Sequence, residues 1–338
     1  MTYEVTIGIP LYNAEQFIRR ALDSALAQTF KSVEFLVLDD CGTDSSLDIV
    51  KEYQQTHPRG KDIRIVSQLY NKGIGLARNR IVEEARGRYL YFMDADDAIT
   101  PNAIEHLYLA AQKYSTDVVY GSYERIEEYC CPVRRIRKQY AETVFLEENA
   151  FASWVYDKYD NLQAMIWNIL LDVNIYRKNN LSHLPISYLE DLVFTMDLPA
   201  YVHRVVMLSD VTYFYYCREN SASKYQNRTY IKKREIESTI GAMRHLKNIS
   251  FRFKLKPYFP LRMCKVMMTC YFVTTHIMKN EHIIEPPFTN REIRNVMSTP
   301  LTWGDMFRPC KYLMKNLFLY LLGLLPPSLS VWLIRKSM

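Results

Sequence analysis

The chain has 338 residues, of which 49% are hydrophobic and 24% are charged, as in an ordinary globular protein. This composition excludes a chain dominated by disorder, and no run of about 20 uncharged apolar residues predicts a membrane-spanning helix. The net charge of +6 is uneven, because residues 1–225 carry 24 basic and 31 acidic side chains whereas residues 226–338 carry 19 and 6. We therefore expect two parts with different partners, divided near residue 225.

The first 120 residues alternate between strand and helix patterns. Short runs of apolar and β-branched residues predict strands over residues 5–9, 33–38, 63–66, 89–93 and 117–120. Apolar residues at helical spacing follow the first four runs, with Asn13 and residues 43–46 as predicted N-caps, a third helix over 74–85 and a fourth opened by Pro101. This alternation predicts an α/β fold with a mostly parallel sheet and helices on both faces.

The pattern weakens after the fifth predicted strand. The charged residues 124–148 predict a hairpin or loop, residues 149–176 and 187–200 predict helices, and residues 211–217 predict another strand. From about residue 228 the chain is predicted to be helical.

Cysteine usage and the first residues bear on the compartment. The seven cysteines have no metal-binding CxxC spacing, and their odd number predicts reduced thiols in a reducing compartment. A predicted strand begins almost at once, so we expect no signal peptide and a cytoplasmic location.

The last residues combine apolar and basic side chains. Residues 316–325 are almost wholly apolar, and after a Pro-Pro pair the apolar segment 331–334 precedes Arg335-Lys336. Apolar residues and Trp332 beside Lys and Arg are typical of a helix that lies in the plane of an anionic membrane surface. A core helix packed on the rest of the protein has the same pattern, so both interpretations stay open at this point.

Three carboxylates stand close together at the end of the fourth predicted strand, in Asp94-Ala95-Asp96-Asp97. They repel one another, and a hard divalent cation such as Mn²⁺ or Mg²⁺ compensates this repulsion while it binds diphosphate oxygens. The alternative is a solvated acidic turn in which Asp97 caps the next helix.

Other polar clusters also follow strands. Tyr12-Asn13 and Asp39-Asp40 come directly after the first and second strands, and residues 71–79 form a Gly-containing turn at a helix start. Ligands bind parallel sheets at the carboxyl ends of the strands, so these clusters should converge on one crevice. A carboxylate there can accept hydrogen bonds from a base or ribose, and basic groups at a helix start suit a diphosphate. Taken singly, each cluster is equally typical of a cap or an ordinary turn.

An acidic pair, Glu190-Asp191, lies among the apolar residues of the segment 188–194. A carboxylate in a cleft can take a proton from an acceptor hydroxyl. The alternative is a helix N-terminal charge that the helix dipole favours.

The order of these segments resembles glycosyltransferase family 2, whose fold is called GT-A. The dense part of the resemblance covers about residues 4–110 and includes Ile9-Pro10-Leu11-Tyr12-Asn13-Ala14-Glu15, Asp39-Asp40, residues 71–79, and Ala85-Arg86-Gly87-Arg88-Tyr89 leading to Asp94. A sparser part includes Trp167-Asn168, Glu190-Asp191 and Arg218. The chain departs from the family pattern at Cys41-Gly42-Thr43, where Gly-Ser-Thr is usual, and at Ile169, where a Lys often follows Trp-Asn.

The resemblance implies roles for individual residues. The positions that hold the nucleotide, usually uridine, are matched by Pro10, Tyr12, Glu15 and Asp40. Arg78 and Asn79 match the segment near the diphosphate and donor sugar. Asp94 and Asp96 match the DxD pair, with Asp96 as the metal ligand, and Asp191 matches the catalytic base.

The predicted function is therefore inverting, metal-dependent transfer of a hexose from a nucleotide-sugar, preferably UDP-linked, in bacterial surface polysaccharide synthesis. The GT-A domain would occupy residues 1–225, and the acceptor would be a saccharide or lipid-linked saccharide. The basic region 226–338 would contact an anionic membrane at its inner face, and no nucleic-acid partner is expected. The alternatives are a nucleotidyltransferase, which leaves Glu190-Asp191 without a role, and an inactive lipid-binding scaffold, which leaves the acidic cluster unexplained.

Overall fold

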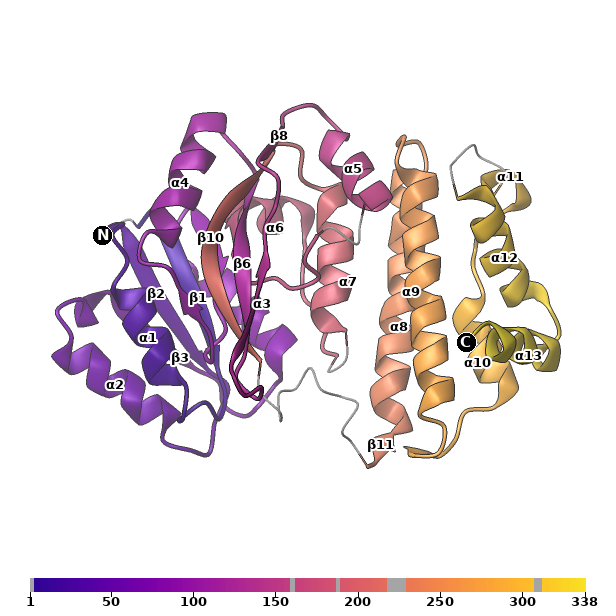
Figure 1. Ribbon diagram of the computed structural model, residues 1–338, viewed down its shortest axis with the longest axis horizontal. Helices are drawn as coiled ribbons and strands as arrows, with labels where there is room; N and C mark the ends of the chain where they lie inside the picture. The colour runs from indigo at the N-terminus through magenta and orange to yellow at the C-terminus, as the bar shows by residue number, and fades with distance from the viewer. Residues whose placement is uncertain (1–2, 159–161, 187–188, 218–228, 307–311) are drawn as a thin grey trace. The chain divides into compact units, whose positions relative to one another are not determined.

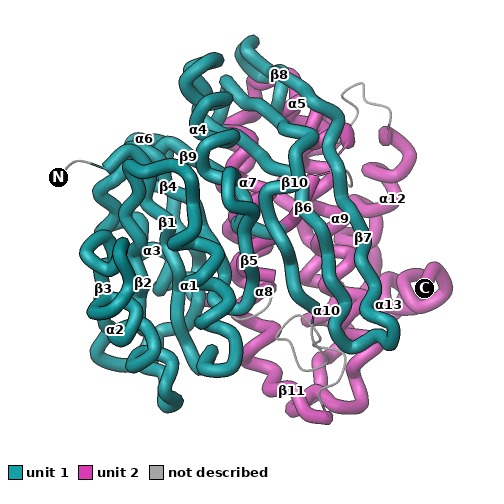
Figure 2. Tube along the Cα trace, turned by 60° about the vertical axis from the view of Figure 1, so that its left-hand side comes forward, with its two compact units in different colours: residues 1–151, 165–185, 201–224 teal, residues 152–164, 186–200, 225–338 magenta. Residues whose placement is uncertain are grey.

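The computed structural model describes residues 3–158, 162–186, 189–217, 229–306 and 312–338. The chain folds as two compact units (Figures 1 and 2). The first unit consists of residues 1–151, 165–185 and 201–224. The second unit consists of residues 152–164, 186–200 and 225–338. The chain thus enters the second unit for the last time at residue 225, after two earlier segments that sequence patterns did not separate.

A mixed sheet forms the centre of the first unit. Its strands are β1 (Val5–Leu11), β2 (Val33–Asp39), β3 (Ile63–Ser67), β4 (Tyr89–Phe92), β5 (Ala98–Ile99), β6 (Val118–Glu127), β7 (Arg134–Lys138), β8 (Thr143–Phe145), β9 (Ile169–Asp172) and β10 (Val205–Cys217). The main path runs β3-β2-β1-β4-β9-β6-β10-β5, with β7 beside β6 and β8 beside β10. Strands β3, β2, β1 and β4 are parallel, whereas β9 is antiparallel to both its neighbours. The predicted α/β class is confirmed, and the predicted hairpin is the antiparallel pair β6–β7.

Helices cover both faces of the parallel part of this sheet (Figure 1). The helices of the first unit are α1 (Ile18–Leu26), α2 (Ser46–Thr56), α3 (Ile74–Glu84), α4 (Ala103–Tyr114) and α6 (Val173–Asn179). On one face, Leu22 of α1 and Leu107 of α4 join Ile7 of β1 in the main hydrophobic core. The next residue of β1, Gly8, points to the other face, where a Cβ would lie 2.4 Å from Ile81 of α3. Gly8 therefore lets α3 approach the sheet closely.

Strand β1 extends past its predicted end at residue 9 and includes Pro10. The N–H of Met93 donates to the carbonyl of Gly8 on the β4 side, and the N–H of Asp40 donates to the carbonyl of Leu11 on the β2 side. Pro10 therefore turns its nitrogen toward the β4 side, where strand pairing has already stopped at Gly8. A proline is tolerated because no ladder hydrogen bond is lost.

The helix predicted over residues 149–176 is wrong in its central part. The chain forms α5 (Ala150–Lys158), then β9, then α6. Ile169, Leu170 and Leu171 are buried and pair with β4 and β6. A short apolar run fits a buried strand or a buried helix equally well, so the two neighbouring strands decide its conformation.

A buried polar cluster fixes β9 to β6. The side-chain amide of Asn168 donates to the carbonyl oxygens of Gly121 at 2.7 Å and Ser122 at 3.0 Å. Its Oδ1 accepts from the hydroxyls of Tyr91 at 3.0 Å and Thr212 at 2.7 Å. Every polar atom of the Asn168 side chain thus has a partner, as burial requires.

Replacing Gly121 by Ala is expected to lower the free energy of unfolding by about 1–3 kcal/mol. A Cβ at this position would lie 1.9 Å from the Thr212 hydroxyl oxygen and 3.0 Å from the Asn168 amide. The matched control is Gly241→Ala, at a helix position where an added Cβ meets nothing within 4 Å. This variant should raise the free energy of unfolding by about 0.5–1 kcal/mol. Urea denaturation of both variants checks the prediction, and equal midpoints would contradict it.

The second unit is helical. Its elements are α7 (Glu190–Asp197), β11 (Ile231–Lys232), α8 (Lys233–Ser250), α9 (Phe259–Lys279), β12 (Ile284–Glu285), α10 (Asn290–Met297), α11 (Trp303–Met306), α12 (Leu313–Leu324) and α13 (Pro327–Ser337), together with most of α5. Helices α8 and α9 lie side by side (Figure 1). Within the ranges described above, no helix is both long and apolar enough to cross a bilayer.

A buried arginine joins α9 to α7. The Arg262 guanidinium donates to the hydroxyl of Tyr156, to the carbonyl of Met196 at 3.2 Å and to the carboxylate of Asp197, and its Nε donates to Ser250 Oγ at 2.9 Å. Arg262 is fully buried. The last turn of α7 is therefore held by a charge-assisted network rather than by apolar contact alone.

The variant Arg262→Leu is expected to lower the free energy of unfolding by about 3–5 kcal/mol, because Asp197 loses its charge partner and three buried polar atoms each lose a hydrogen bond. The control Arg335→Ala removes an exposed pair with Glu281 and should cost less than about 1 kcal/mol. Tryptophan fluorescence during urea denaturation measures both. Similar losses in the two variants would contradict the structural role of Arg262.

Candidate functional site

A pocket of about 460 Å³ opens at the carboxyl ends of β1, β2 and β4. The predicted donor-binding residues that line it are Pro10, Tyr12, Asp40, Arg78, Asp94 and Asp96. Parallel strands bring these residues together although they are far apart in the sequence, as expected for the edge where strands end. Two other predicted donor-binding residues, Glu15 and Asn79, do not line the pocket.

The acidic cluster forms the loop after β4. One carboxylate oxygen from each of Asp94, Asp96 and Asp97 lies within 4.8 Å of the others. Asp94 and Asp96 are partly exposed, whereas Asp97 is fully buried. Burial, together with the charges of Asp96 and Asp94, raises the pKa of the Asp97 carboxyl well above its usual value. Oxygen donors under mutual repulsion fit a hard divalent cation.

Asp97 does not cap the following helix. Its carboxylate accepts hydrogen bonds from the Tyr213 hydroxyl at 2.7 Å and from the Tyr216 N–H at 2.8 Å. Helix α4 begins at Ala103, after the N-cap residue Asn102. Asp97 therefore ties the acidic loop to β10 and leaves Asp94 and Asp96 on the pocket side.

Arg20, which sequence reasoning missed, supports the same loop. Its guanidinium donates to the backbone carbonyl of Asp96 at 2.6 Å and pairs with Glu128 at 2.9 Å. It also lies over the Tyr216 ring, 3.5 Å from the centroid. Nothing local in the sequence distinguishes Arg20 from a solvated arginine on an amphipathic helix.

An aromatic stack lies behind the acidic loop. The Trp167 and Tyr213 rings are 4.4 Å apart and nearly parallel, and Tyr123 meets Trp167 edge to face at 5.0 Å. The Tyr213 hydroxyl also accepts the N–H of Asp94 at 3.2 Å. Tyr213 thus contacts the loop at both Asp94 and Asp97. Trp167 stacks on Tyr213 and so supports the loop indirectly.

Asp40 is buried at the end of β2 and organises the start of α3. Its carboxylate accepts the backbone N–H groups of Lys72 at 2.8 Å and Gly73 at 2.9 Å, and the amide of Gln68 at 2.8 Å. Gly73 has φ +84°, a conformation that glycine adopts without strain. One carboxylate therefore shapes the glycine turn and also faces the pocket.

The loops after β1 and β2 are joined by side-chain bonds to backbone. Asn13 was predicted as an N-cap, but α1 begins only at Ile18. Asn13 has φ +46°, and its Oδ1 accepts the N–H of Thr43 at 2.7 Å. Asn tolerates this left-handed conformation better than most residues, and here its side chain holds the loop after β2.

Glu15 is bound to the start of α2. Its carboxylate accepts the Ser45 N–H at 3.2 Å, and its own N–H donates to Asp44 at 2.9 Å. Asp44 in turn accepts the N–H of Ser46 at 3.0 Å, which agrees with the predicted cap of this helix. The observed contacts of Glu15 are thus structural, and its contact with a nucleotide stays a prediction.

The two donor-side residues of α3 point to different partners. Arg78 is buried, and its guanidinium lies 3.5 Å from the Asp94 carboxylate and above the Phe92 ring. The Asn79 side chain instead exchanges two hydrogen bonds with the backbone of His183, at 2.9 and 2.8 Å. Arg78 belongs to the pocket, and Asn79 fixes the segment after α6.

Asp191 lies in the first turn of α7, in the second unit. Its neighbour Glu190 is buried at the helix start. Carboxylates in the first turn complement the helix dipole, so this position is compatible with both interpretations of the pair. The role of Asp191 as a base stays a prediction, and Arg218 lies outside the described residues.

Sequence comparison relates the chain to known glycosyltransferases. Residues 6–166 match the family described as Glycosyl transferase family 2. Glycosyltransferase GlyA of Streptococcus pneumoniae is 35% identical over 125 residues, which are 37% of this chain and 17% of that protein. The uncharacterized glycosyltransferase YibD of Escherichia coli is 28% identical over 228 residues, which are 66% of this chain and 64% of that protein. Both matches cover less than two thirds of the relative's own length.

The fold is also similar to a solved structure. The crystal structure of TarS residues 1–349 from Staphylococcus aureus in complex with UDP-GlcNAc superimposes with a TM-score of 0.60. The superposition covers 99% of this chain and 92% of that one, at 17% identity, so the likeness concerns the fold. TarS is named a poly(ribitol-phosphate) β-N-acetylglucosaminyltransferase. Residues 6–166 of this chain thus match glycosyltransferase family 2, and its fold is of the GT-A type that TarS has.

Proposed function

We propose that the protein transfers a sugar, with inversion, from a UDP-sugar to a hydroxyl of a saccharide or lipid-linked saccharide acceptor. The observation that carries the proposal is the pocket at the strand ends, which places Tyr12 and Asp40 in one cavity with Asp94 and Asp96. The relatives found favour a glycosyltransferase over a nucleotidyltransferase. The name of TarS supports an acceptor that belongs to a bacterial surface polymer.

The nucleotide would bind between the loops after β1 and β2. The half-exposed ring of Tyr12 offers an aromatic face to a base, and Pro10 lines the same cavity. Asp40 supplies a fixed acceptor for a base or ribose donor group, because the turn at Lys72 and Gly73 holds its carboxylate in place. The proposal of uridine also draws on TarS, which was solved with UDP-GlcNAc.

The diphosphate would lie beside α3 and the acidic loop. Arg78 brings a buried positive charge to this side of the pocket, 3.5 Å from Asp94. Asp94 and Asp96 have the donor type and spacing to hold Mn²⁺ or Mg²⁺, with Asp96 as the principal ligand. A bound cation would neutralise charge that develops on the departing diphosphate.

Asp191 would act as the base. It takes the proton of the acceptor hydroxyl while that oxygen forms a bond to the anomeric carbon and the bond to the diphosphate breaks. Attack opposite the leaving group inverts the configuration. A single carboxylate suffices for this displacement, whereas glycoside hydrolysis requires an acid–base pair.

Calorimetric titration with UDP, with and without Mn²⁺, tests the donor site, and GDP serves as the matched ligand. We expect UDP to bind, to bind more tightly with Mn²⁺, and to bind more tightly than GDP. A preference for GDP would overturn the choice of donor. Failure of both nucleotides to bind would overturn the transferase proposal.

The proposal includes a location at the inner face of the cell membrane. Residues 226–338 carry 19 basic and 6 acidic side chains, a net charge of +13, which favours contact with anionic lipid. A lipid-linked acceptor would be present at the same membrane surface, where the enzyme would reach it.

A further inference from the structure

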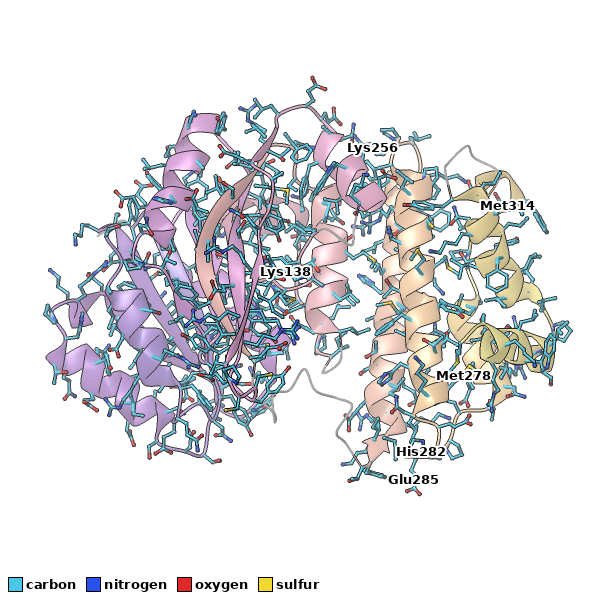
Figure 3. All side chains as sticks on the ribbon, in the orientation of Figure 1. Lys138, Lys256, Met278, His282, Glu285 and Met314 are labelled. Carbon is cyan, nitrogen blue, oxygen red and sulfur yellow. The ribbon has the colours of Figure 1, made fainter. Side chains whose placement is uncertain are left out.

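Helix α12 is apolar around most of its circumference, yet only one side of it is covered. Leu319 and Tyr320 are buried against the rest of the second unit. On the uncovered side, Met314, Phe318 and Leu321 are 76%, 40% and 37% exposed (Figure 3, where Met314 is labelled). Their spacing of four and three residues places them on one helix face.

Helix α13, which follows α12 after a short turn, also exposes apolar side chains. Leu329 and Trp332, three residues apart, are 43% and 54% exposed. Leu324, at the end of α12, is 56% exposed. Helices α12 and α13 both pack on α10 and also contact each other. We call Met314, Phe318, Leu321, Leu324, Leu329 and Trp332 the apolar face.

The charged side chains of the segment that carries the apolar face are all positive. Residues 312–338 contain Lys315, Arg335 and Lys336 and no Asp or Glu. Lys315 and Lys336 are exposed, and Arg335 pairs with Glu281 of the same unit. Two copies of a segment with only positive charges repel each other, whereas an anionic surface attracts it.

The dimensions favour a helix that lies on a bilayer rather than across it. Helix α12 has 12 residues, which correspond to about 18 Å, and about 30 Å are needed to span the hydrocarbon core. Its apolar side chains, with Trp332 and lysines beside them, match the side chains that settle at the boundary between headgroups and acyl chains.

We propose that the apolar face docks in the plane of an anionic lipid bilayer, with Lys315 and Lys336 facing the headgroups. The inference assigns a surface to the peripheral location proposed above, and it does not depend on the transferase chemistry.

Sedimentation of the full chain with vesicles tests the proposal. Vesicles of phosphatidylcholine mixed with phosphatidylglycerol are compared with vesicles of phosphatidylcholine alone. The double variant Phe318→Ser/Trp332→Ser is expected to lower the partition coefficient at least roughly tenfold, because two large apolar side chains no longer enter the lipid. The matched control is Leu109→Ser, which removes a 59% exposed leucine from α4 and should bind as the wild type does.

A second variant tests the electrostatic part without touching any packed side chain. Lys315→Ala/Lys336→Ala should bind the anionic vesicles roughly tenfold more weakly, and added salt should remove the difference. The control Lys31→Ala/Lys61→Ala changes two exposed lysines of the other unit and should have no effect.

Three results would overturn the inference. The wild type could fail to bind anionic vesicles, both double variants could bind as tightly as the wild type, or light scattering could show a dimer that Phe318→Ser/Trp332→Ser converts to a monomer. The last result would assign the face to a second copy of the chain. Wild-type protein that binds vesicles but no nucleotide would overturn the transferase proposal alone.

Discussion

The variant Asp96→Asn should lower kcat/KM for sugar transfer by about 10³-fold, because a divalent cation supplies several kcal/mol of charge stabilisation and each 1.36 kcal/mol is tenfold in rate. It should also remove the effect of Mn²⁺ on UDP binding. The backbone of Asp96 is held by Arg20, so the substitution leaves the loop in place and removes one charge. Calorimetry with UDP and turnover of the UDP-sugar identified by screening measure the two effects.

Two further variants complete this experiment. Asp48→Asn neutralises a carboxylate that is 77% exposed on α2, and it should leave both quantities unchanged. Asp94→Asn should have a smaller effect than Asp96→Asn, because Asp94 already neighbours the Arg78 guanidinium. A larger effect at Asp94 would reverse the assignment of the principal ligand.

The variant Asp191→Asn is expected to lower kcat roughly 10²–10⁴-fold, the usual contribution of a general base, while the affinity for UDP stays that of the wild type. The amide has nearly the shape of the carboxylate, so the variant keeps the side-chain volume and loses the negative charge and the capacity to accept a proton. Steady-state turnover with the identified donor and acceptor gives kcat, and calorimetry gives the UDP affinity.

The control for the base is Glu237→Gln, an exposed residue of α8 in the same unit, which should turn over as the wild type does. A decrease below tenfold in Asp191→Asn would remove this residue as the base. Parallel losses of turnover and of UDP affinity would instead assign Asp191 to donor binding.

The strands whose ends form the pocket could be predicted, because the residue types within each strand are enough to indicate a strand. Runs such as Phe35 to Leu38 lie in a parallel sheet that is covered on both faces, so they are apolar throughout and end where polar residues begin. The positions of Asp40 and Asp94 after such runs were enough to predict that they meet. The structure confirms this, since both line one cavity.

Other features depend on neighbours that are distant in the sequence. Ile169 to Leu171 become a strand because β4 and β6 offer hydrogen bonds on both sides. Pro10 stays inside β1 because the pairing with β4 has already stopped. The strand or helix propensity of a single residue does not show which strands lie beside it. Tertiary contacts therefore override that propensity at both places.

The sequence by itself determined the α/β class, the edge of the sheet where the pocket lies, and the carboxylates offered to a cation. The tertiary structure alone decided which predicted side chains reach the pocket. Glu15 and Asn79 form hydrogen bonds with α2 and with His183, and Arg20, unremarkable in the sequence, holds the acidic loop. The physical reason is that a polar side chain takes the nearest unsatisfied backbone group, and folding decides which group that is.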